Sequence, residues 1–231
     1  MSIVTCHDVT KTYQQGKVPV TALQSVNVEV EAGSFIALAG PSGSGKTTLL
    51  NLIGGLDRPD EGRILVGGND YSQLKDAQMA ELRLHHIGFV FQAYNLIPVL
   101  SAVENVEYVM LLQGVPPAQR RRRSHQILND VGLEGKYDRR PAELSGGQQQ
   151  RVAVARAIVS NPSIVLADEP TANLDSKTGE GLLQLMQEMN TRRGVTFIFS
   201  THDSMVMQYA RRVVTIHDGR ISDDQSKGTH K

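Results

Sequence analysis

The chain has 231 residues, of which 40% are hydrophobic and 21% are charged, a mixture typical of a folded globular domain and not of a disordered or fibrous protein. Lys plus Arg and Asp plus Glu both total 24, so the formal net charge is zero. Because binding to nucleic acid normally leaves a basic footprint on a protein, we expect no nucleic-acid partner.

Short apolar runs alternate with helical patterns along the chain, which predicts an α/β fold with a mainly parallel sheet flanked by helices. The run at residues 35–39 predicts a buried strand, and a glycine-rich loop and an apolar helix through residues 48–53 follow it. Runs at residues 87–91, 164–167 and 195–199 predict further buried strands. Each ends at a polar residue that can face a ligand, because ligands of open α/β sheets bind at the carboxyl ends of the strands.

A region of helical patterns interrupts this alternation. Between Gln92 and about Leu144 the strand-like runs disappear. We interpret the region as an inserted helical subdomain at about residues 93–159. Residues 1–92 and 160–231 then form the core of what we predict to be a single domain.

The glycine-rich loop fits the phosphates of a nucleotide. Residues 40–47 match the pattern G-x-x-x-x-G-K-[ST], with a predicted strand before it and a helix after it. Glycines let backbone N–H groups point at phosphate oxygens, and the helix N-terminus adds a favourable dipole. Lys46 can neutralise the β and γ phosphates, and the Thr47 hydroxyl can bind Mg²⁺. The predicted phosphate-binding residues are Gly40, Pro41, Ser42, Gly43, Ser44, Gly45, Lys46 and Thr47.

Two adjacent carboxylates follow the predicted strand at residues 164–167. Asp168 can hold the Mg²⁺ shell through water, and Glu169 can reach a water aligned with the γ phosphate. Buried charge without a partner is unfavourable, so two acids at the end of a buried strand require such a reason. The pair therefore predicts phosphate hydrolysis with Glu169 as the general base.

A second glycine-rich string, residues 144–148, precedes a helical run at residues 151–159. Ser145 is a favourable N-cap and the two glycines permit close backbone approach, so this helix start can bind a second anion. It lies in or beside the helical subdomain, away from residues 40–47. It can serve the same nucleotide only if another copy of the chain presents it.

These motifs resemble those of the ATP-binding subunits of ABC transporters, in the family's order and over nearly the whole chain. The string at 144–148 looks like the signature motif, residues 40–48 like the Walker A loop, and Asp168 with Glu169 like the Walker B pair. The resemblance adds Tyr13 as the residue that stacks on adenine, Thr48 of Walker A, the Q-loop residue Gln92, the D-loop residue Asp175 and the switch histidine His202.

The resemblance implies a P-loop NTPase core with an N-terminal antiparallel β region and an α-helical subdomain. It also implies a head-to-tail homodimer in which ATP binding closes the two chains together and hydrolysis reopens them. The cofactors are expected to be ATP and Mg²⁺. The residues expected to close over the partner's ATP are Ser145, Gly146, Gly147 and Gln148. The expected catalytic residues are Glu169, His202 and Gln92, and the expected metal ligands are Thr47, Gln92 and Asp168.

Without the family resemblance, three of these residues would be given structural roles and no function. His202 would then be a surface histidine, Tyr13 a core residue and Gln92 an unremarkable strand end. Ala172 departs from the family pattern, because many relatives carry serine or glycine there.

Two other features attract less specific interpretations. Residues 120–123 are four consecutive arginines that cover a full helical turn, which we interpret as solvated; the alternative is contact with anionic lipid or an acidic loop of a membrane partner. His85 and His86 are adjacent, which is poor geometry for one metal ion, so we expect no structural metal.

The cellular location is predicted from what the sequence lacks. Cys6 is the only cysteine, which suits a reducing compartment, and the N-terminus does not resemble a signal peptide. No apolar run approaches the roughly 18 residues that span a bilayer. If the protein works at a membrane, it therefore works through a partner. The resemblance to ABC-transporter subunits implies a peripheral protein on the cytoplasmic face of the inner membrane, bound to separate transmembrane permease subunits.

Within the family, residues 54–59, 91–96 and 168–179 look most like the bacterial lipoprotein-releasing and macrolide-exporting group. Members of that group drive a long periplasmic stalk from the cytoplasm, so we expect an ATPase subunit for export or for such mechanical transmission. The alternatives are the ATPase of another ABC system, such as an amino-acid importer, and a cell-division-type ABC regulator.

Overall fold

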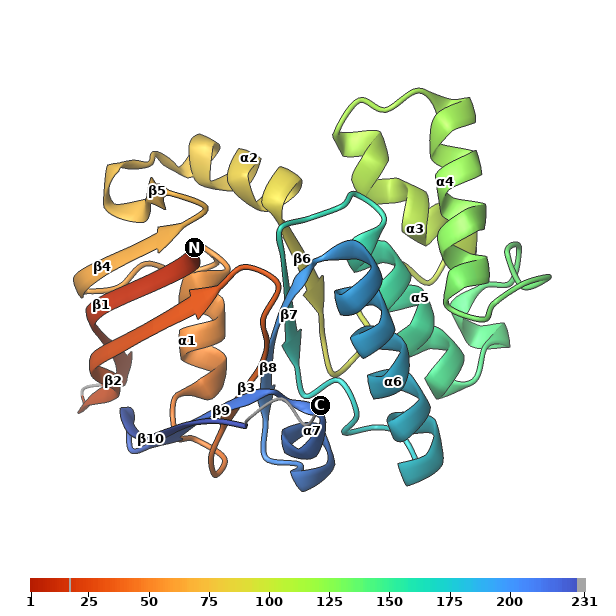
Figure 1. Ribbon diagram of the computed structural model, residues 1–231. Helices are drawn as coiled ribbons and strands as arrows, with labels where there is room; N and C mark the ends of the chain where they lie inside the picture. The colour runs from red at the N-terminus through yellow and green to blue at the C-terminus, as the bar shows by residue number, and fades with distance from the viewer. Residues whose placement is uncertain (17, 228–231) are drawn as a thin grey trace.

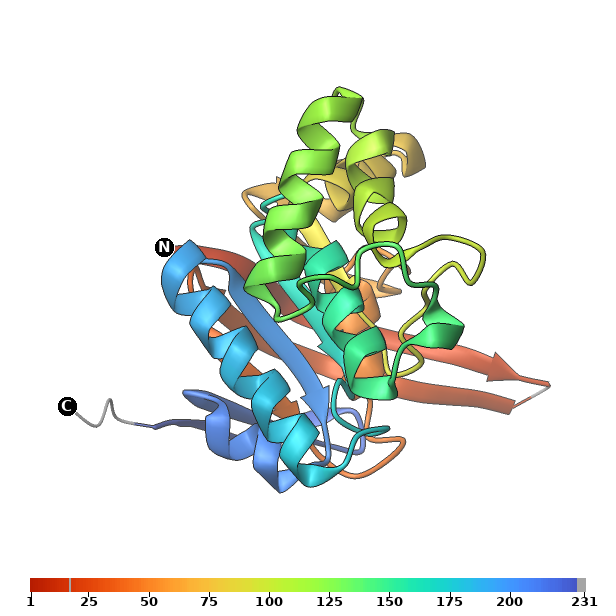
Figure 2. The same cartoon turned by 90° about the vertical axis from the view of Figure 1, so that its right-hand side faces the viewer.

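The computed structural model describes residues 1–16 and 18–227 of the chain. Within these ranges the strands form two sheets (Figure 1). The first is antiparallel, with the strand order β2-β1-β4-β5. Its strands are β1 (Ser2–Gln15), β2 (Val18–Glu31), β4 (Glu61–Val66) and β5 (Asn69–Asp70). The β1–β2 pair extends beyond the body of the molecule (Figure 2).

The second sheet has the strand order β10-β9-β3-β8-β7-β6. Its strands are β3 (Phe35–Ala39), β6 (Ile87–Val90), β7 (Ile164–Asp168), β8 (Thr196–Thr201), β9 (Arg212–His217) and β10 (Arg220–Ser226). All neighbours are parallel except β10, which is antiparallel to β9. The residues that follow β3, β6, β7 and β8 therefore lie at one edge of the sheet.

Helices cover both faces of the second sheet (Figure 1). Helix α1 (Lys46–Ile53) lies between the two sheets, whereas α5 (Gly146–Ile158) and α6 (Ser176–Arg193) cover the opposite face. Successive side chains of β3 alternate between these layers, because side chains of a strand point to opposite faces. Ile36 belongs to the α1 cluster and Ala37 to the α5 and α6 cluster, and both faces of β3 are buried.

The remaining helices surround this core. Helix α2 (Asp76–His86) leads from the antiparallel sheet to β6, and α7 (Ser204–Tyr209) follows β8. Helices α3 (Ala102–Leu112) and α4 (Pro117–Asp130) pack with α5 beside the sheet (Figure 2). Short 3-10 turns occupy Tyr71–Gln73 and Pro141–Glu143. Across the described residues, none of the helices combines the length and hydrophobicity that crossing a bilayer requires.

The α/β fold predicted from the sequence, including the antiparallel N-terminal region, is confirmed. The strands predicted at residues 35–39, 87–91 and 164–167 match β3, β6 and β7 to within one residue. The strand predicted at residues 195–199 is longer, since β8 runs on to Thr201. Those extra residues bring the strand into contact with the site described below.

The arginine run is partly solvated, as the sequence suggested, because Arg121 and Arg122 are exposed and the other two arginines are half-buried. The run lies in α4, where Arg120 and Arg123 donate to the backbone oxygens of Val115 and Val159, each at 2.6 Å. Arg121 Nε lies 2.8 Å from Glu107 Oε1. Three of the four arginines therefore bind groups within the chain, because a full helical turn directs its side chains to several sides.

Candidate nucleotide site

The carboxyl edge of the parallel sheet surrounds a cavity of about 460 Å³. The cavity lies where the loops after β3, β6, β7 and β8 meet. Its lining residues are Ala22, Pro41, Ser42, Gly43, Gly45, Lys46, Thr47, Thr48, Gln92, Asp168, Glu169, Ala172 and His202. The structure thus brings together the predicted phosphate loop, both carboxylates, Gln92 and His202.

The loop before α1 has a backbone that requires glycine. Gly45 has a φ of 107°, and a Cβ atom there would lie 2.5 Å from the carbonyl oxygen of Ala22. The buried Lys46 Nζ donates to the carbonyl oxygens of Gly40 and Pro41, both at 2.8 Å. The ammonium group is therefore held over the loop, next to the N-terminus of α1, where an anion is favoured.

Oxygen ligands suitable for a divalent cation adjoin this loop. Thr47 Oγ1 donates to Asp168 Oδ1 at 3.0 Å, and Gln92 lines the same cavity. Hydroxyl, carboxylate and amide oxygens are hard ligands of the type that Mg²⁺ prefers. The donor set therefore fits Mg²⁺.

Glu169 has an unusual backbone and two side-chain partners. Its φ of 44° lies in the left-handed region, which few residues other than glycine adopt. Its Oε1 lies 2.7 Å from His202 Nδ1, and its Oε2 accepts from Thr201 Oγ1 at 3.2 Å. Sequence reasoning found Glu169 and His202 but missed Thr201, although Thr201 directly precedes His202.

Tyr13 lies outside the set of residues that line the cavity. Its ring is 40% exposed, its hydroxyl donates to Asp57 Oδ2 at 2.9 Å, and Lys11 Nζ lies 5.3 Å from the ring centroid. Burial and the Asp57 carboxylate raise the pKa of Tyr13. Burial also opposes ionisation of Asp57, but hydrogen bonds from Lys11 and the backbone of Arg58 outweigh it and lower the pKa of Asp57. Sequence reasoning found neither Asp57 nor Lys11.

The second glycine-rich string has the local structure of a helix start. Ser145 is the N-cap of α5: its Oγ accepts from the Gln148 N–H at 3.3 Å, and Gln148 Oε1 accepts from the Ser145 N–H at 3.1 Å. A Cβ atom on Gly146 would lie 2.9 Å from Tyr94 Oη. Among the described residues that line the cavity, none belongs to this string. One chain therefore keeps the two predicted phosphate sites apart.

Asp175 also lies outside the cavity lining. It is the N-cap of α6, where its Oδ1 accepts from the Thr178 N–H at 3.0 Å. Hydrogen bonds from Thr178 lower the pKa of Asp175.

Hydrogen bonds join the loops that carry these motifs. Asn173 Nδ2 donates to the carbonyl oxygen of Gln92 at 2.9 Å, and the fully buried Gln150 of α5 donates to that of Pro170 at 2.8 Å. Arg156 donates to the carbonyl oxygens of Tyr94 and Asn95. Sequence reasoning missed Gln150 and Arg156; the available signal for Arg156 was a single charged residue within the apolar run at residues 152–159.

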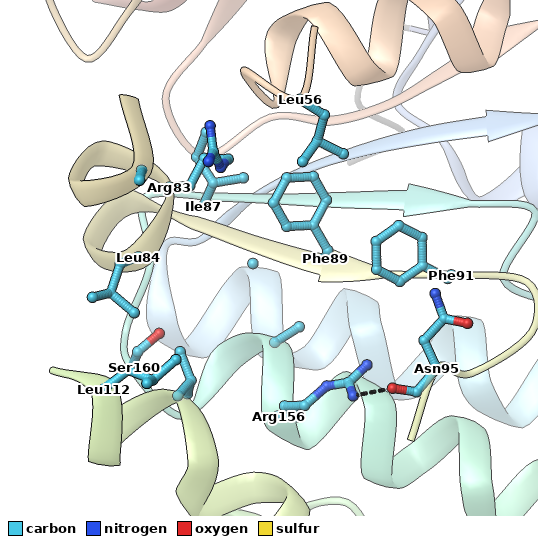
Figure 3. A pocket seen from close by; sticks show the side chains of 14 residues that line it. Leu56, Arg83, Leu84, Ile87, Phe89, Phe91, Asn95, Leu112, Arg156 and Ser160 are labelled. Atoms are coloured by element: carbon cyan, nitrogen blue, oxygen red, sulfur yellow. Dashed lines mark hydrogen bonds between the residues drawn. The ribbon is translucent and has the colours of Figure 1, made fainter. Parts of the chain in front are cut away.

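A second cavity, of about 580 Å³, lies between β6, α2, α3 and α5 (Figure 3). Phe89 and Phe91 line it, with their ring centroids 5.7 Å apart and their planes nearly parallel. Leu56 and Leu112 are half exposed at its rim, and the guanidinium of Arg156 lies at its base. Burial lowers the pKa of Arg156. The groove is therefore apolar with a cationic end.

Comparisons with known proteins identify the family. Residues 23–172 match the family model described as "ABC transporter". An uncharacterised ABC transporter ATP-binding protein of Thermotoga maritima is 47% identical over 96% of this chain and 94% of its own length. The macrolide export ATP-binding/permease protein MacB of Syntrophobacter fumaroxidans is also 47% identical, over 97% of this chain, which spans only 32% of that relative.

Solved structures agree with the sequence comparisons. One of them is the dimeric structure of the ATP-binding cassette MJ0796 in a post-hydrolysis state bound to ADP and Pi. It matches this chain with a TM-score of 0.89 and 42% sequence identity, and the match covers 96% of this chain and 98% of that one. A protein of the same designation is known from Methanocaldococcus jannaschii. The motifs, the cavity and these comparisons lead to one conclusion: the chain belongs to the ABC transporter family and is an ATP-binding, ATP-hydrolysing subunit.

Proposed function

We propose that the chain works as a homodimer in which each ATP is held by residues 40–47 of one chain and covered by Ser145, Gly146, Gly147 and Gln148 of the partner. The observation that carries this proposal is the separation of the two predicted phosphate sites: among the described residues that line the cavity, none belongs to the string at 144–148. The dimeric form of MJ0796, at 42% identity, supports it.

The chemistry of the proposed site follows from the cavity. Lys46 and the loop N–H groups bind the β and γ phosphates. Tyr13, which lies outside the cavity lining, is proposed to stack on adenine because the family resemblance implies that role. Thr47 and Gln92 would hold Mg²⁺ and Asp168 would bind its water; when bound, Mg²⁺ neutralises charge on the phosphates. Glu169 removes the proton from the attacking water, and His202 orients Glu169 and contacts the γ phosphate.

The membrane partner is proposed to be a separate permease subunit that inserts an apolar segment between Leu56, Phe89 and Leu112. Apolar grooves of this size are preferred binding sites, and Arg83 and Arg156 offer positive charge to an acidic residue of that segment. The chain would then be peripheral on the cytoplasmic face of the inner membrane. Macrolide-export relatives favour the export and stalk-driving group over an importer.

A mixing experiment tests the shared site. Lys46→Ala removes the phosphate-binding charge, and Ser145→Arg obstructs the surface offered to the partner; each variant alone should hydrolyse ATP at a background rate. An equal mixture should recover roughly a quarter of the wild-type rate, since half of the dimers are heterodimers with one intact site each.

The control mixes Lys46→Ala with the double variant Lys46→Ala/Ser145→Arg, which can form no intact site and should recover nothing. Failure of the first mixture to recover, or full activity of Ser145→Arg alone, would refute the shared site.

The group within the family is tested by isolating the detergent-solubilised membrane partner and identifying it. A partner with four transmembrane helices and a large external domain supports the stalk-driving group, and a compact permease contradicts it.

A further inference from the structure

Both carboxylate oxygens of Glu169 have a side-chain partner, and the two partners differ in burial. His202, at Oε1, has a side chain that is 67% exposed. Thr201, at Oε2, is fully buried at the end of β8. The hydrogen bond from Thr201 is part-buried, so water competes with it less than with the exposed contact to His202.

The hydroxyl of Thr201 is oriented by the backbone. The Asp203 N–H donates to Thr201 Oγ1 at 2.9 Å. Since this N–H occupies a lone pair, the single hydroxyl proton is left for Glu169. Asp203 is fixed in turn, because its Oδ1 accepts from the Met205 N–H at 2.8 Å and its Oδ2 from Thr171 Oγ1 at 3.1 Å. The hydroxyl group of Thr201 is therefore oriented toward Glu169 independently of His202.

We propose that Thr201 is a positioning residue that holds the Glu169 carboxylate in line with the attacking water during ATP hydrolysis. This inference rests on the proposed role of Glu169 as general base. The contact of Thr201 with Oε2 does not depend on His202, which contacts the other oxygen. Loss of the hydroxyl leaves the base with no fixed direction, although its binding site for ATP is unchanged.

Thr201→Val tests this role, because valine keeps the shape of threonine and removes only the hydroxyl. The expected kcat is about 10-fold to 100-fold lower, the worth of a hydrogen bond to a charged group. The KM for ATP and the affinity for a fluorescent ATP analogue should change by less than about twofold. Thr201→Ser should recover most of the rate. The ATP-bound dimer of Thr201→Val should also persist longer on size exclusion, since hydrolysis ends the bound state.

The other end of β8 offers a matched control. Thr196 is equally buried, and its hydroxyl accepts from the Gly33 N–H at 3.0 Å, as Thr201 accepts from Asp203. Thr196→Val therefore removes the same buried acceptor without touching Glu169. It should lower the melting temperature as Thr201→Val does and keep the wild-type kcat. Equal kcat losses in the two variants would overturn the proposal.

A double-mutant cycle decides whether Thr201 acts through Glu169. In a Glu169→Gln background, Thr201→Val should lower single-turnover hydrolysis by no more than about twofold, because the base is already absent. An additive loss would overturn the positioning role. If Glu169→Gln itself retains the wild-type rate, the proposed base fails; if only Thr201→Val retains it, the positioning inference alone fails.

A second substitution covers the case in which Thr201→Val does not fold by circular dichroism. Thr201→Cys keeps a small side chain but donates only a weak hydrogen bond. Its kcat should fall below that of Thr201→Ser. Equal rates for the serine and cysteine variants would overturn the proposal.

Discussion

At the scale of single residues, the site is organised by contacts between neighbouring strand ends. Glu169 follows β7 and Thr201 ends β8, and these strands pair in register, with Asp168 opposite Ser200. The Glu169 N–H donates to the Ser200 carbonyl oxygen at 2.9 Å, which extends the ladder by one bond. The left-handed φ of Glu169 then departs from the strand. Such uncommon backbone is concentrated at functional sites.

Glu169→Gln should abolish the proposed general base while keeping the shape of the side chain. We expect turnover to fall by about 10²- to 10⁴-fold, the usual contribution of a positioned base, with ATP affinity unchanged. Phosphate release and equilibrium nucleotide binding measure the two quantities. Glu188→Gln on the exposed side of α6 is the control and should keep the wild-type rate. Undiminished turnover in Glu169→Gln would contradict the assigned role.

At the scale of elements, the helical region is attached to the sheet by close backbone packing. Gly88 of β6 faces α5, and a Cβ atom there would lie 2.3 Å from the carbonyl oxygen of Ala157. Strand and helix therefore approach more closely than any side chain would allow. This contact fixes α5 relative to β6. The N-cap of α5 is Ser145, and Gln92 lies two residues after the end of β6.

Gly88→Ala should separate β6 from α5. We expect a loss of about 1–3 kcal/mol in the free energy of unfolding, as for other overpacked cores, measured by urea denaturation. Gly181→Ala in α6 is the matched control, because a Cβ atom there would be 3.6 Å from Arg151 Nη2, an ordinary contact. The free energy of unfolding of Gly181→Ala should be unchanged or higher than that of wild type by up to about 1 kcal/mol. Equal effects of the two substitutions would contradict this account.

The edge of the second sheet is joined to the first through Arg212. Its Nε and Nη2 donate to the two carboxylate oxygens of Asp224 at 2.7 and 2.6 Å, and its Nη1 donates to the Glu29 carbonyl oxygen at 2.6 Å. The hydrogen bonds from Arg212 lower the pKa of Asp224 despite partial burial. One guanidinium therefore ties β9 to both β10 and β2.

This lowered pKa gives a direction for the pH dependence of stability. The folded-state pKa lies below the unfolded value of about 3.9, so the stabilisation is complete above that value and is lost as pH falls through the folded-state pKa. The urea midpoints of wild type and Asp224→Asn should therefore differ most above about pH 5, and the difference should begin to shrink below about pH 4 and disappear once the pH is below the folded-state pKa. Asp223→Asn, one residue away, is the charge-matched control. A difference independent of pH would contradict the ion pair's contribution.

At the scale of the whole molecule, the nucleotide cavity and the apolar groove are both lined by residues of the loop that follows β6. Gln92 lines the cavity, whereas Phe91 and Asn95 line the groove. Arg156 holds this loop to α5 through Tyr94 and Asn95. A change at the nucleotide can therefore reach the groove along a short, hydrogen-bonded segment.

Leu56→Asp should separate catalysis from membrane association. Leu56 is half exposed at the groove rim, so aspartate should be tolerated in folding while its desolvation opposes docking of an apolar segment. We expect the ATPase rate of the isolated chain to be unchanged and co-purification of the membrane subunit to be lost. Val18→Asp, on the exposed part of β2, is the control and should retain the partner. Retention by Leu56→Asp would exclude the groove as the docking site.

The sequence alone determined the family and the parallel sheet, and it predicts which residues form the phosphate loop. Residues 40–47 are contiguous, and their glycine spacing itself specifies the backbone that binds phosphate. The alternation of apolar runs with helices likewise predicts strands whose ends share an edge. Ser145 could be assigned as an N-cap because capping depends on neighbours within a single helical turn.

Only the tertiary structure decided which distant side chains meet. The contacts of Tyr13 with Asp57, of Glu169 with Thr201 and of Arg156 with residues 94–95 join segments 32 to 62 positions apart. Such pairs depend on strand order and on the packing of α5 against β6, which no local pattern encodes. The apolar groove has the same origin, because its walls come from four separate elements. Sequence therefore specified the chemistry that depends on chain-adjacent residues, and packing specified how that chemistry is oriented.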